Sequence, residues 1–167
     1  MTEREANADR SRAGERGPIL VAVDFTPDSE AALYWACEFA ECVGAAVKVL
    51  HVVHDPEDAP GSYRLKGHDA LRPLDDVAGE MMAEFLEKAK GGEPDLRAIS
   101  VAEPVIVKGI PASRILEVAE RERARMIVMG SRGRTGLPHL LLGSKAERVV
   151  QLSAIPVTIV KAKAKDD

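Results

Sequence analysis

The stretch from Met129 to Ser144 reads M-G-S-R-G-R-T-G-L-P-H-L-L-L-G-S, and the fold prediction starts from it. The apolar run Met126–Met129 leads into this stretch and predicts a short buried strand, and an amphipathic segment that predicts a helix follows it. Backbone N–H groups between small residues are open to a ligand because glycine has no Cβ to cover them. Such N–H groups and the N-terminus of the next helix together suit an anion. The stretch therefore predicts a phosphate-binding loop, with a plain connecting turn as the alternative. Its glycines are Gly130, Gly133, Gly136 and Gly143.

Two widespread phosphate-binding motifs are absent from this loop. The pattern Gly-x4-Gly-Lys-Ser/Thr does not occur, and neither does Gly-x-Gly-x-x-Gly.

The residues Ser144-Lys-Ala-Glu147 match a capping box, in which the serine and glutamate side chains satisfy free backbone N–H groups at a helix start. We therefore expect the last helix to begin at Ser144, with its hydroxyl as the cap.

Apolar segments alternate with helical ones along the chain. A protein with this alternation is α/β, with an open parallel five-stranded sheet and helices on both faces. Thr26-Pro27 marks the first helix start, and Pro104 suggests that the third strand is irregular or lies at an edge. The expected strands are 18–23, 46–53, 96–107, 126–129 and 156–160, and the expected helices are 27–43, 74–90, 112–123 and one from Ser144.

Composition excludes several function classes. The 167 residues carry a net charge of −4, so no basic field attracts nucleic acid or an anionic membrane. Aromatic residues make up 4% of the chain, too few for base-stacking platforms. The apolar runs are shorter than the roughly 20 residues of a membrane span, and the charged N-terminus does not resemble a secretory signal. We therefore expect a cytoplasmic protein.

The chain is expected to form one domain over residues 18–161. Residues 1–17 are polar and without periodicity, which predicts a disordered arm, and residues 162–167 form a charged tail. Cys37 and Cys42 lie five residues apart in a helical segment, so they face different sides and should not pair. His51, His54 and Asp55 lie close together in sequence, but only two of them are histidines and no third ligand has the helix or hairpin spacing that would define a site, so no metal site is predicted.

Several motifs resemble those of one known family. The spacing Gly130-x2-Gly133-x9-Gly143-Ser144 is similar to that of the ATP-binding branch of the universal stress protein family. Further matches are Val21-Ala-Val-Asp24-Phe-Thr, Leu50-His51-Val52 and Ala154-Ile-Pro156-Val157, in the family's order. The resemblance covers Pro18 to about Lys161.

The resemblance implies a Rossmann-like sheet with strand order 3-2-1-4-5. In that order the chain reverses direction between strands one and four. Ligands of open parallel sheets bind at such a switch point, beyond the carboxyl ends of the strands. Asp24 ends strand one and Gly130 ends strand four, so the motif and the geometric rule indicate the same crevice.

The resemblance also implies ATP as ligand, with Mg²⁺ or Mn²⁺ held largely by phosphates and water. Asp24, the only buried carboxylate expected here, suits a ribose hydroxyl or a water on the cation, with Ala22 and Val23 beside the nucleoside. Val52 and Met129 are expected against the adenine. Arg132 and Arg134 are either donors to the outer phosphates or solvated loop charges. The expected phosphate-binding groups are the backbone N–H groups around Gly130, Gly133, Gly143, Ser144 and Lys145 and the hydroxyls of Ser131 and Ser144.

No catalytic constellation accompanies the binding loop in the sequence. Phosphoryl transfer needs a group that orients the attacking water or acceptor, so at most slow ATP hydrolysis is expected. The main hypothesis is an ATP-dependent sensor or regulator with an unknown protein partner. The alternative is a nucleotide-independent interaction module, a homodimer through strand Val157–Val160, which the resemblance also implies. An adenylating enzyme is disfavoured because Asp24-Phe-Thr-Pro stands where that chemistry needs Ser-Gly-Gly-x-Asp-Ser.

Overall fold

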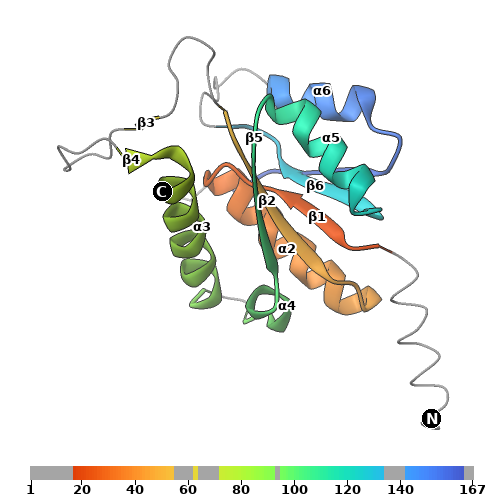
Figure 1. Cartoon of the computed structure of the whole chain (residues 1–167). Coiled ribbons are helices and arrows are strands. Elements are labelled where there is room, and N and C mark those ends of the chain that lie inside the picture. The colour runs from red at the N-terminus through yellow and green to blue at the C-terminus, as the bar shows by residue number, and fades with distance from the viewer. Residues whose placement is uncertain (1–16, 55–61, 64–71, 93–94, 134–141, 164–167) are drawn as a thin grey trace, which may run out of the picture.

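A computed structural model describes residues 17–54, 62–63, 72–92, 95–133 and 142–163, and every structural statement below concerns these residues. Five parallel strands form one sheet in the order β5-β2-β1-β6-β7 (Figure 1). This confirms the predicted order 3-2-1-4-5. The strands are β1 (Ile19–Ala22), β2 (Val47–Val53), β5 (Glu103–Lys108), β6 (Met126–Gly130) and β7 (Val157–Val160).

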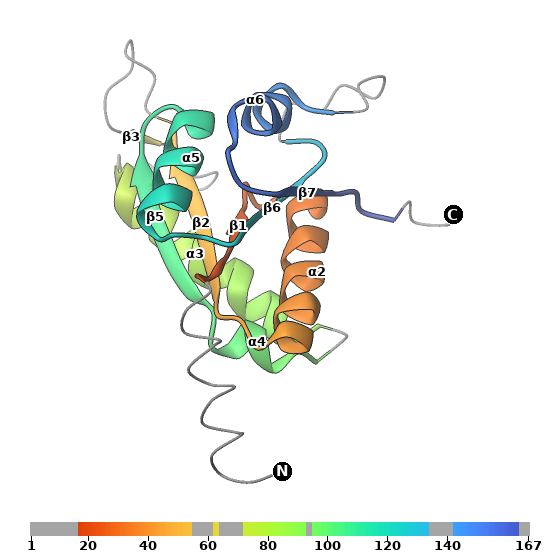
Figure 2. The same ribbon diagram turned by 90° about the vertical axis from the view of Figure 1, so that its right-hand side faces the viewer.

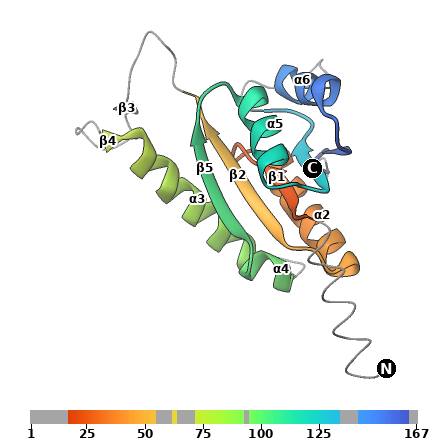
Figure 3. The same ribbon diagram turned by 45° about the vertical axis from the view of Figure 1, so that its right-hand side comes forward.

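Helices cover both faces of the sheet, as predicted. Figures 1 and 2 show α2 and α3 on one face and α5 and α6 on the other. A short antiparallel pair, β3 (Ser62–Tyr63) and β4 (Arg72–Pro73), precedes α3, and Figure 3 shows it beside the N-terminal start of that helix. The helices are α2 (Pro27–Val43), α3 (Leu74–Lys90), α4 (Arg97–Ser100), α5 (Pro111–Arg121) and α6 (Ser144–Leu152).

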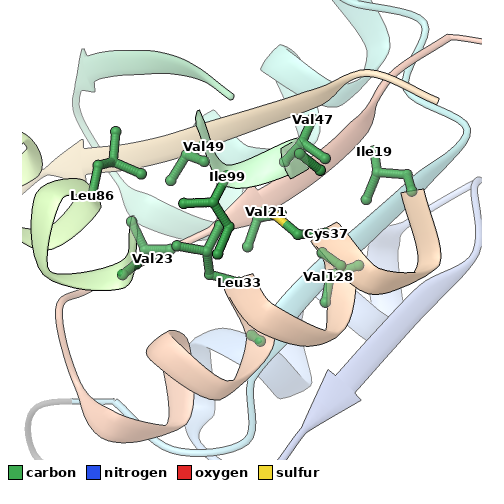
Figure 4. Packing of buried hydrophobic residues seen from close by; sticks show 14 of the residues in the cluster. Ile19, Val21, Val23, Leu33, Cys37, Val47, Val49, Leu86, Ile99 and Val128 are labelled. Carbon is green, nitrogen blue, oxygen red and sulfur yellow. The ribbon is translucent and has the colours of Figure 1, made fainter. Parts of the chain in front are cut away.

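The two faces of the sheet contribute to two separate cores. Side chains alternate along β1, so Ile19, Val21 and Val23 pack under α2 and α3, while Leu20 and Ala22 pack under α5 and α6. Figure 4 shows the first cluster, in which the β1 and β2 side chains face α2. Every residue of β1 is buried because it is the middle strand of five. This explains why its sequence is continuously apolar.

Local signals define the ends of α2. Thr26 is the N-cap, and its Oγ1 accepts a hydrogen bond from the backbone N–H of Ser29 at 3.3 Å. Pro27 occupies the first turn, and Gly44 ends the helix with a left-handed φ of 64°. Both ends were predicted from the sequence, because the capping residues lie within a few positions of the groups they satisfy.

The single strand predicted over residues 96–107 is wrong in its first half. Residues Arg97–Ser100 form the short helix α4, and β5 begins only at Glu103. Ala98 and Ile99 of α4 are buried in the α2–α3 core, and the Ala98 N–H donates to Glu41 of α2 at 2.8 Å. Tertiary contacts therefore override the strand propensity of this segment. Pro104 does lie in an edge strand, because β5 is the last strand on its side.

The two cysteines do not pair, as predicted. Cys37 is buried and Cys42 is exposed, and both are free thiols. Burial raises the pKa of Cys37 to about 12.

Among the described residues, no helix combines the length and the apolar character that crossing a membrane requires. The predicted arm 1–17 lies outside the described residues except for Gly17, and so do most of 56–73 and the end of the predicted tail.

Candidate functional site

The candidate site lies where β1 and β6 end side by side. These strands are parallel neighbours, and Ala22 pairs with Met129 in register. The chain continues from β1 to β2 on one side, whereas β6 and β7 lie on the other side, so this is the switch point of the sheet. A Cβ built on Gly133 would lie 2.9 Å from Oδ2 of Asp24. The structure therefore brings together Asp24 and the glycine-rich loop, which are more than 100 residues apart in sequence.

Asp24 is half-buried and its carboxylate is oriented by its neighbours. Oδ1 accepts from the Thr26 hydroxyl at 2.6 Å and from the Thr26 N–H at 3.3 Å. The Asp24 N–H donates to the Ser29 hydroxyl at 3.4 Å. Oδ2 has no hydrogen-bond donor among the described residues and lies beside Gly133. One carboxylate oxygen is therefore available to a ligand hydroxyl, a water or a cation.

Phe25 makes the turn that follows Asp24. Its φ of 65° lies in the left-handed region, which is unfavourable for a bulky residue. The ring packs against His51, with 4.4 Å between ring centroids, and edge-on against Phe85 of α3 at 5.5 Å. His51 Nδ1 lies 2.8 Å from the Val23 carbonyl oxygen and carries the proton, because a carbonyl only accepts. These contacts hold the strained turn in place.

Gly130 is required by packing at the end of β6. A Cβ there would lie 2.8 Å from the backbone carbonyl carbon of Asp28 and 2.9 Å from the Ser29 nitrogen. Real Cβ atoms do not approach a backbone so closely. The first glycine of the motif therefore allows the N-terminus of α2 to rest directly on the strand end.

The carboxylate that is buried at this place is that of Asp28, whereas Asp24 is only half-buried, so the expectation that Asp24 is the only buried carboxylate is wrong. Asp28 is 5% exposed and Ser131 is 4% exposed. Asp28 Oδ2 accepts from the Ser131 hydroxyl at 2.7 Å, the Arg132 N–H at 3.1 Å and Arg132 Nε at 3.4 Å. Oδ1 accepts from the Ala162 N–H at 3.2 Å.

The charge state of Asp28 follows from these contacts. Burial by itself raises the pKa of this carboxyl. The hydrogen bonds from Ser131 and Ala162, together with the Arg132 guanidinium, outweigh burial and hold the pKa below its usual value. In the sequence Asp28 looks like an ordinary acidic residue in a first helical turn. Its partners follow it by more than 100 residues, so no local pattern predicts them.

Several backbone donors of the predicted phosphate loop already have protein acceptors. Ser131 N donates to Val160 O at 2.7 Å, and Gly143 N donates to Ser131 O at 2.8 Å. Arg132 N and the Ser131 hydroxyl are occupied by Asp28. The Gly133 N–H has no acceptor among the described residues. Among the loop residues Ser131, Arg132, Gly133 and Gly143, Gly133 is thus the one whose backbone N–H is left open.

The start of α6 offers a further group of open donors. The capping box expected at Ser144 is wrong: Gly143 is the N-cap, and no side chain caps this helix. The first helix-type bond is donated by Glu147 N to Gly143 O at 2.9 Å. The N–H groups of Ser144, Lys145 and Ala146 therefore lack an intrahelical acceptor. They add to the positive end of the helix dipole.

The two ends of the loop meet in space. A Cβ on Gly143 would lie 3.4 Å from Ser131 O and 3.7 Å from Gly133 N. Open N–H groups of Gly133 and of the α6 start are thus gathered near Asp24 Oδ2, an arrangement that fits a polyanion with an adjoining hydroxyl. Arg134, Gly136 and His139 lie outside the described residues.

The remaining predicted site residues also lie at the carboxyl end of the sheet. Ala22, Val23 and Met129 are buried at the ends of β1 and β6, and Val52 is half-buried near the end of β2. Their contact with a base stays a prediction. Across the described part of the chain, no three His, Cys, Asp or Glu side chains gather closely enough to hold a metal ion.

The fold and the site define a class: an open parallel α/β protein with a glycine-rich loop at the switch point of its sheet. The model of the universal stress protein family matches residues 15–161, so the chain belongs to that family. It is 32% identical over 160 residues to universal stress protein MJ0577 of Methanocaldococcus jannaschii, covering 87% of this chain and 94% of the relative. It is 42% identical over 148 residues to MJ0531 of the same organism, covering 89% and 84%.

Solved structures agree with this assignment. The structure of a universal stress protein from Archaeoglobus fulgidus in complex with dAMP matches with a TM-score of 0.57 at 26% identity. The match covers 87% of this chain and 98% of that one. The structure of MJ0577 matches with a TM-score of 0.63 at 28% identity, over 89% and 98% of the two chains.

Proposed function

We propose that this chain is an adenine-nucleotide-binding regulator, with ATP as its ligand. The observation that carries the proposal is the group of open backbone donors near Asp24. Gly133 N–H and the first N–H groups of α6 have no acceptor in the described protein, and a free carboxylate oxygen lies beside them. Neutral donors on fixed backbone suit phosphate oxygens, and a carboxylate suits a ribose hydroxyl.

The binding mode follows from this distribution of groups. The N–H groups of Gly133, Ser144 and Lys145 hold the phosphates, and the α6 dipole stabilises their charge. Asp24 Oδ2 accepts from the ribose or from water on a divalent cation. The adenine lies against Val52 and Met129. The complex of the Archaeoglobus fulgidus universal stress protein with dAMP supports an adenylate as the ligand of this chain.

A magnesium or manganese ion would be held mainly by the phosphates and water, as Mg²⁺ usually is. Bound there, the ion would neutralise charge on the phosphates. The chain's own contribution is one carboxylate oxygen of Asp24, oriented by Thr26. This small donor set fits an ion that arrives with the nucleotide.

The proposed role is binding with at most slow hydrolysis. In the proposed binding mode the free Asp24 Oδ2 is taken up by the ribose or by water on the cation, and Asp28 is occupied by Ser131 and Arg132. The proposed regulatory signal is the presence of the nucleotide in the site, which a partner protein would detect by binding differently to the occupied and the empty chain.

Dimerisation through β7 is the second part of the proposal. β7 is the last strand of the sheet, and its residues Val157–Val160 are half-buried and uncharged, without the charges or proline that protect edge strands. On α6, Val150 and Leu152 are exposed at 46% and 51%. An uncharged strand edge with exposed apolar side chains nearby in sequence suits a second copy of the chain.

Isothermal titration of the purified chain with ATP, with and without Mg²⁺, tests the nucleotide site. Gly143→Asp places a carboxylate at the phosphates, and Gly143→Asn is the neutral control of equal size. The φ of Gly143 is −73°, so both side chains fit the backbone, and a Cβ needs only a small shift of Ser131 O. We expect Gly143→Asp to weaken ATP binding about 100-fold or more relative to Gly143→Asn, from charge repulsion at short range.

The same pair of variants separates the two hypotheses. If Gly143→Asp abolishes ATP binding and the protein's cellular phenotype survives, the nucleotide-independent dimeric module is correct. If wild-type protein shows no affinity for ATP, ADP or AMP, the nucleotide proposal is wrong. The predicted cytoplasmic location stays a prediction.

A further inference from the structure

One buried carboxylate connects the glycine loop with the end of the sheet. The two oxygens of Asp28 serve different segments: Oδ2 accepts from Ser131 and Arg132 at the start of the loop, and Oδ1 accepts from Ala162, two residues beyond β7. Asp28 itself lies in the first turn of α2. Three segments that are distant in sequence therefore share a single side chain.

Other contacts make this junction stiff. Ser131 N donates to Val160 O at 2.7 Å, so the loop and the end of β7 are also joined directly. Gly130 packs against the backbone of Asp28 and leaves no room for α2 to move toward the strand. Asp28 and Ser131 are almost completely buried, so water cannot readily replace either partner when a bond breaks.

We propose that Asp28 is a positioning residue that couples the glycine loop to the chain leaving β7. The inference rests on the proposed nucleotide site. A ligand that holds Gly133 also restrains Ser131 and Arg132, which lie just before it. Their restraint keeps Asp28 Oδ1 in place for the Ala162 N–H, so opening of the segment after β7 becomes less frequent when the loop is occupied. Such coupling is a shared free energy between two sites and acts in both directions.

Amide hydrogen exchange over residues 157–163, with and without saturating ATP, measures this coupling. In the wild-type protein we expect ATP to slow exchange of the amides at 160–163 by about fivefold or more, the lower end of usual coupling strengths. Asp28→Asn distinguishes the roles of the two carboxylate oxygens. The asparagine carbonyl can still accept from the three donors of the loop, the Ser131 hydroxyl, Arg132 N and Arg132 Nε, but its NH₂ group faces the Ala162 N–H and cannot accept from it. Each Asp28→Asn measurement is made at ATP concentrations that saturate that variant. The slowing should then disappear.

A second variant breaks the link from the other end. Ala162→Pro removes the N–H that donates to Oδ1 and fixes φ at residue 162, which lies outside the sheet, while it leaves the Asp28 side chain and the residues of the loop themselves unsubstituted. This variant should bind ATP as the wild type does but show no ATP-dependent slowing at Lys161 and Lys163. Glu30→Gln, in the same helix, breaks an exposed ion pair with Lys88 and should keep the full effect.

The outcomes are distinguishable. ATP binding to the wild type without any change of exchange at 160–163 overturns the coupling and leaves the proposed function standing. Slowing that persists in both Asp28→Asn and Ala162→Pro also overturns it. Absence of ATP binding by the wild type overturns the proposed function, and the coupling with it. Slowing in the wild type and Glu30→Gln, lost in the other two variants, supports the coupling.

Discussion

Gly130 and Asp28 are in direct contact, so that no side-chain atom fits between the end of β6 and the first turn of α2. A Cβ at residue 130 would lie 2.8 Å from the Asp28 carbonyl carbon, which is backbone and cannot rotate away. We expect Gly130→Ala to lower the free energy of unfolding by about 1–3 kcal/mol, the usual cost of overpacking. Urea denaturation measures this difference.

Gly79 is the matched control for that substitution. It lies inside α3, and a Cβ there would meet nothing within 4 Å. Gly79→Ala should therefore raise the free energy of unfolding by about 0.5–1 kcal/mol, because alanine favours helix over glycine. Equal effects of the two substitutions would contradict the packing role of Gly130.

The left-handed turn at Phe25 predicts an unusual order of stabilities. Phe25→Ala and Phe25→Gly both lose the contacts with His51 and Phe85. Only alanine still bears the strain of a φ of 65°. We expect the glycine variant to be more stable than the alanine variant by about 1 kcal/mol in thermal or chemical unfolding. An alanine variant as stable as the glycine variant would show that the turn relaxes without the ring.

Asp28 should make the stability of the protein depend on acidic pH. Burial works against its ionisation, but hydrogen bonds from Ser131 and Ala162 and the charge of Arg132 hold its pKa below the usual 3.8. A group with a lowered pKa in the folded state stabilises that state above its unfolded pKa, and the stabilisation is lost as the pH falls through the folded pKa. The wild type should therefore exceed Asp28→Asn in stability most clearly near pH 7.

Urea denaturation of both proteins from pH 7 downward checks this dependence. The difference in unfolding free energy should shrink as the pH falls below about 4, where the unfolded carboxyl takes up its proton. A difference that is constant over this range would mean that the Asp28 contacts do not depend on its charge.

The hydrogen-bond pattern of β7 indicates how to test the proposed dimer. Ile127 N donates to Pro156 O and Ser131 N donates to Val160 O, so even-numbered residues of β7 face β6. Val157 and Ile159 therefore present their N–H groups to the open edge. Ile159→Pro removes one such donor and should shift a β7-paired dimer toward monomer in analytical ultracentrifugation.

Ile159→Ala controls for the lost side chain, because it keeps the backbone N–H. It should retain the dimer if main-chain pairing across β7 carries the association. If both variants remain dimeric at the same concentration as the wild type, the interface lies elsewhere on the chain.

Much of the fold was predictable because its signals are local. Apolar runs flanked by turn residues predicted all five strands, and Thr26, Pro27 and Gly44 predicted the bounds of one helix. The prediction for segment 96–107 was partly wrong because apolar residues such as Ala98 and Ile99 suit a buried strand as well as a buried helix. Their packing in the core under α2 is what favours the helix. The cap of α6 was misread because a matching sequence pattern does not ensure that the side chain turns back to the helix.

The sequence predicted where the site lies but not which of its groups are free to bind a ligand. Glycine spacing and strand order located the loop and Asp24 at the switch point. They did not reveal that the amides of Ser131 and Arg132 are already engaged, because their acceptors, Val160 and Asp28, come from other parts of the chain.

The sequence by itself determined the alternation of strands and helices and the position of the glycine loop, since both follow from periodicity and from residues close together in the chain. The tertiary structure decided which carboxylate is buried and which N–H groups stay open. Those outcomes depend on Asp28 meeting Ser131 across 103 residues, a contact that exists only once the sheet and α2 have packed.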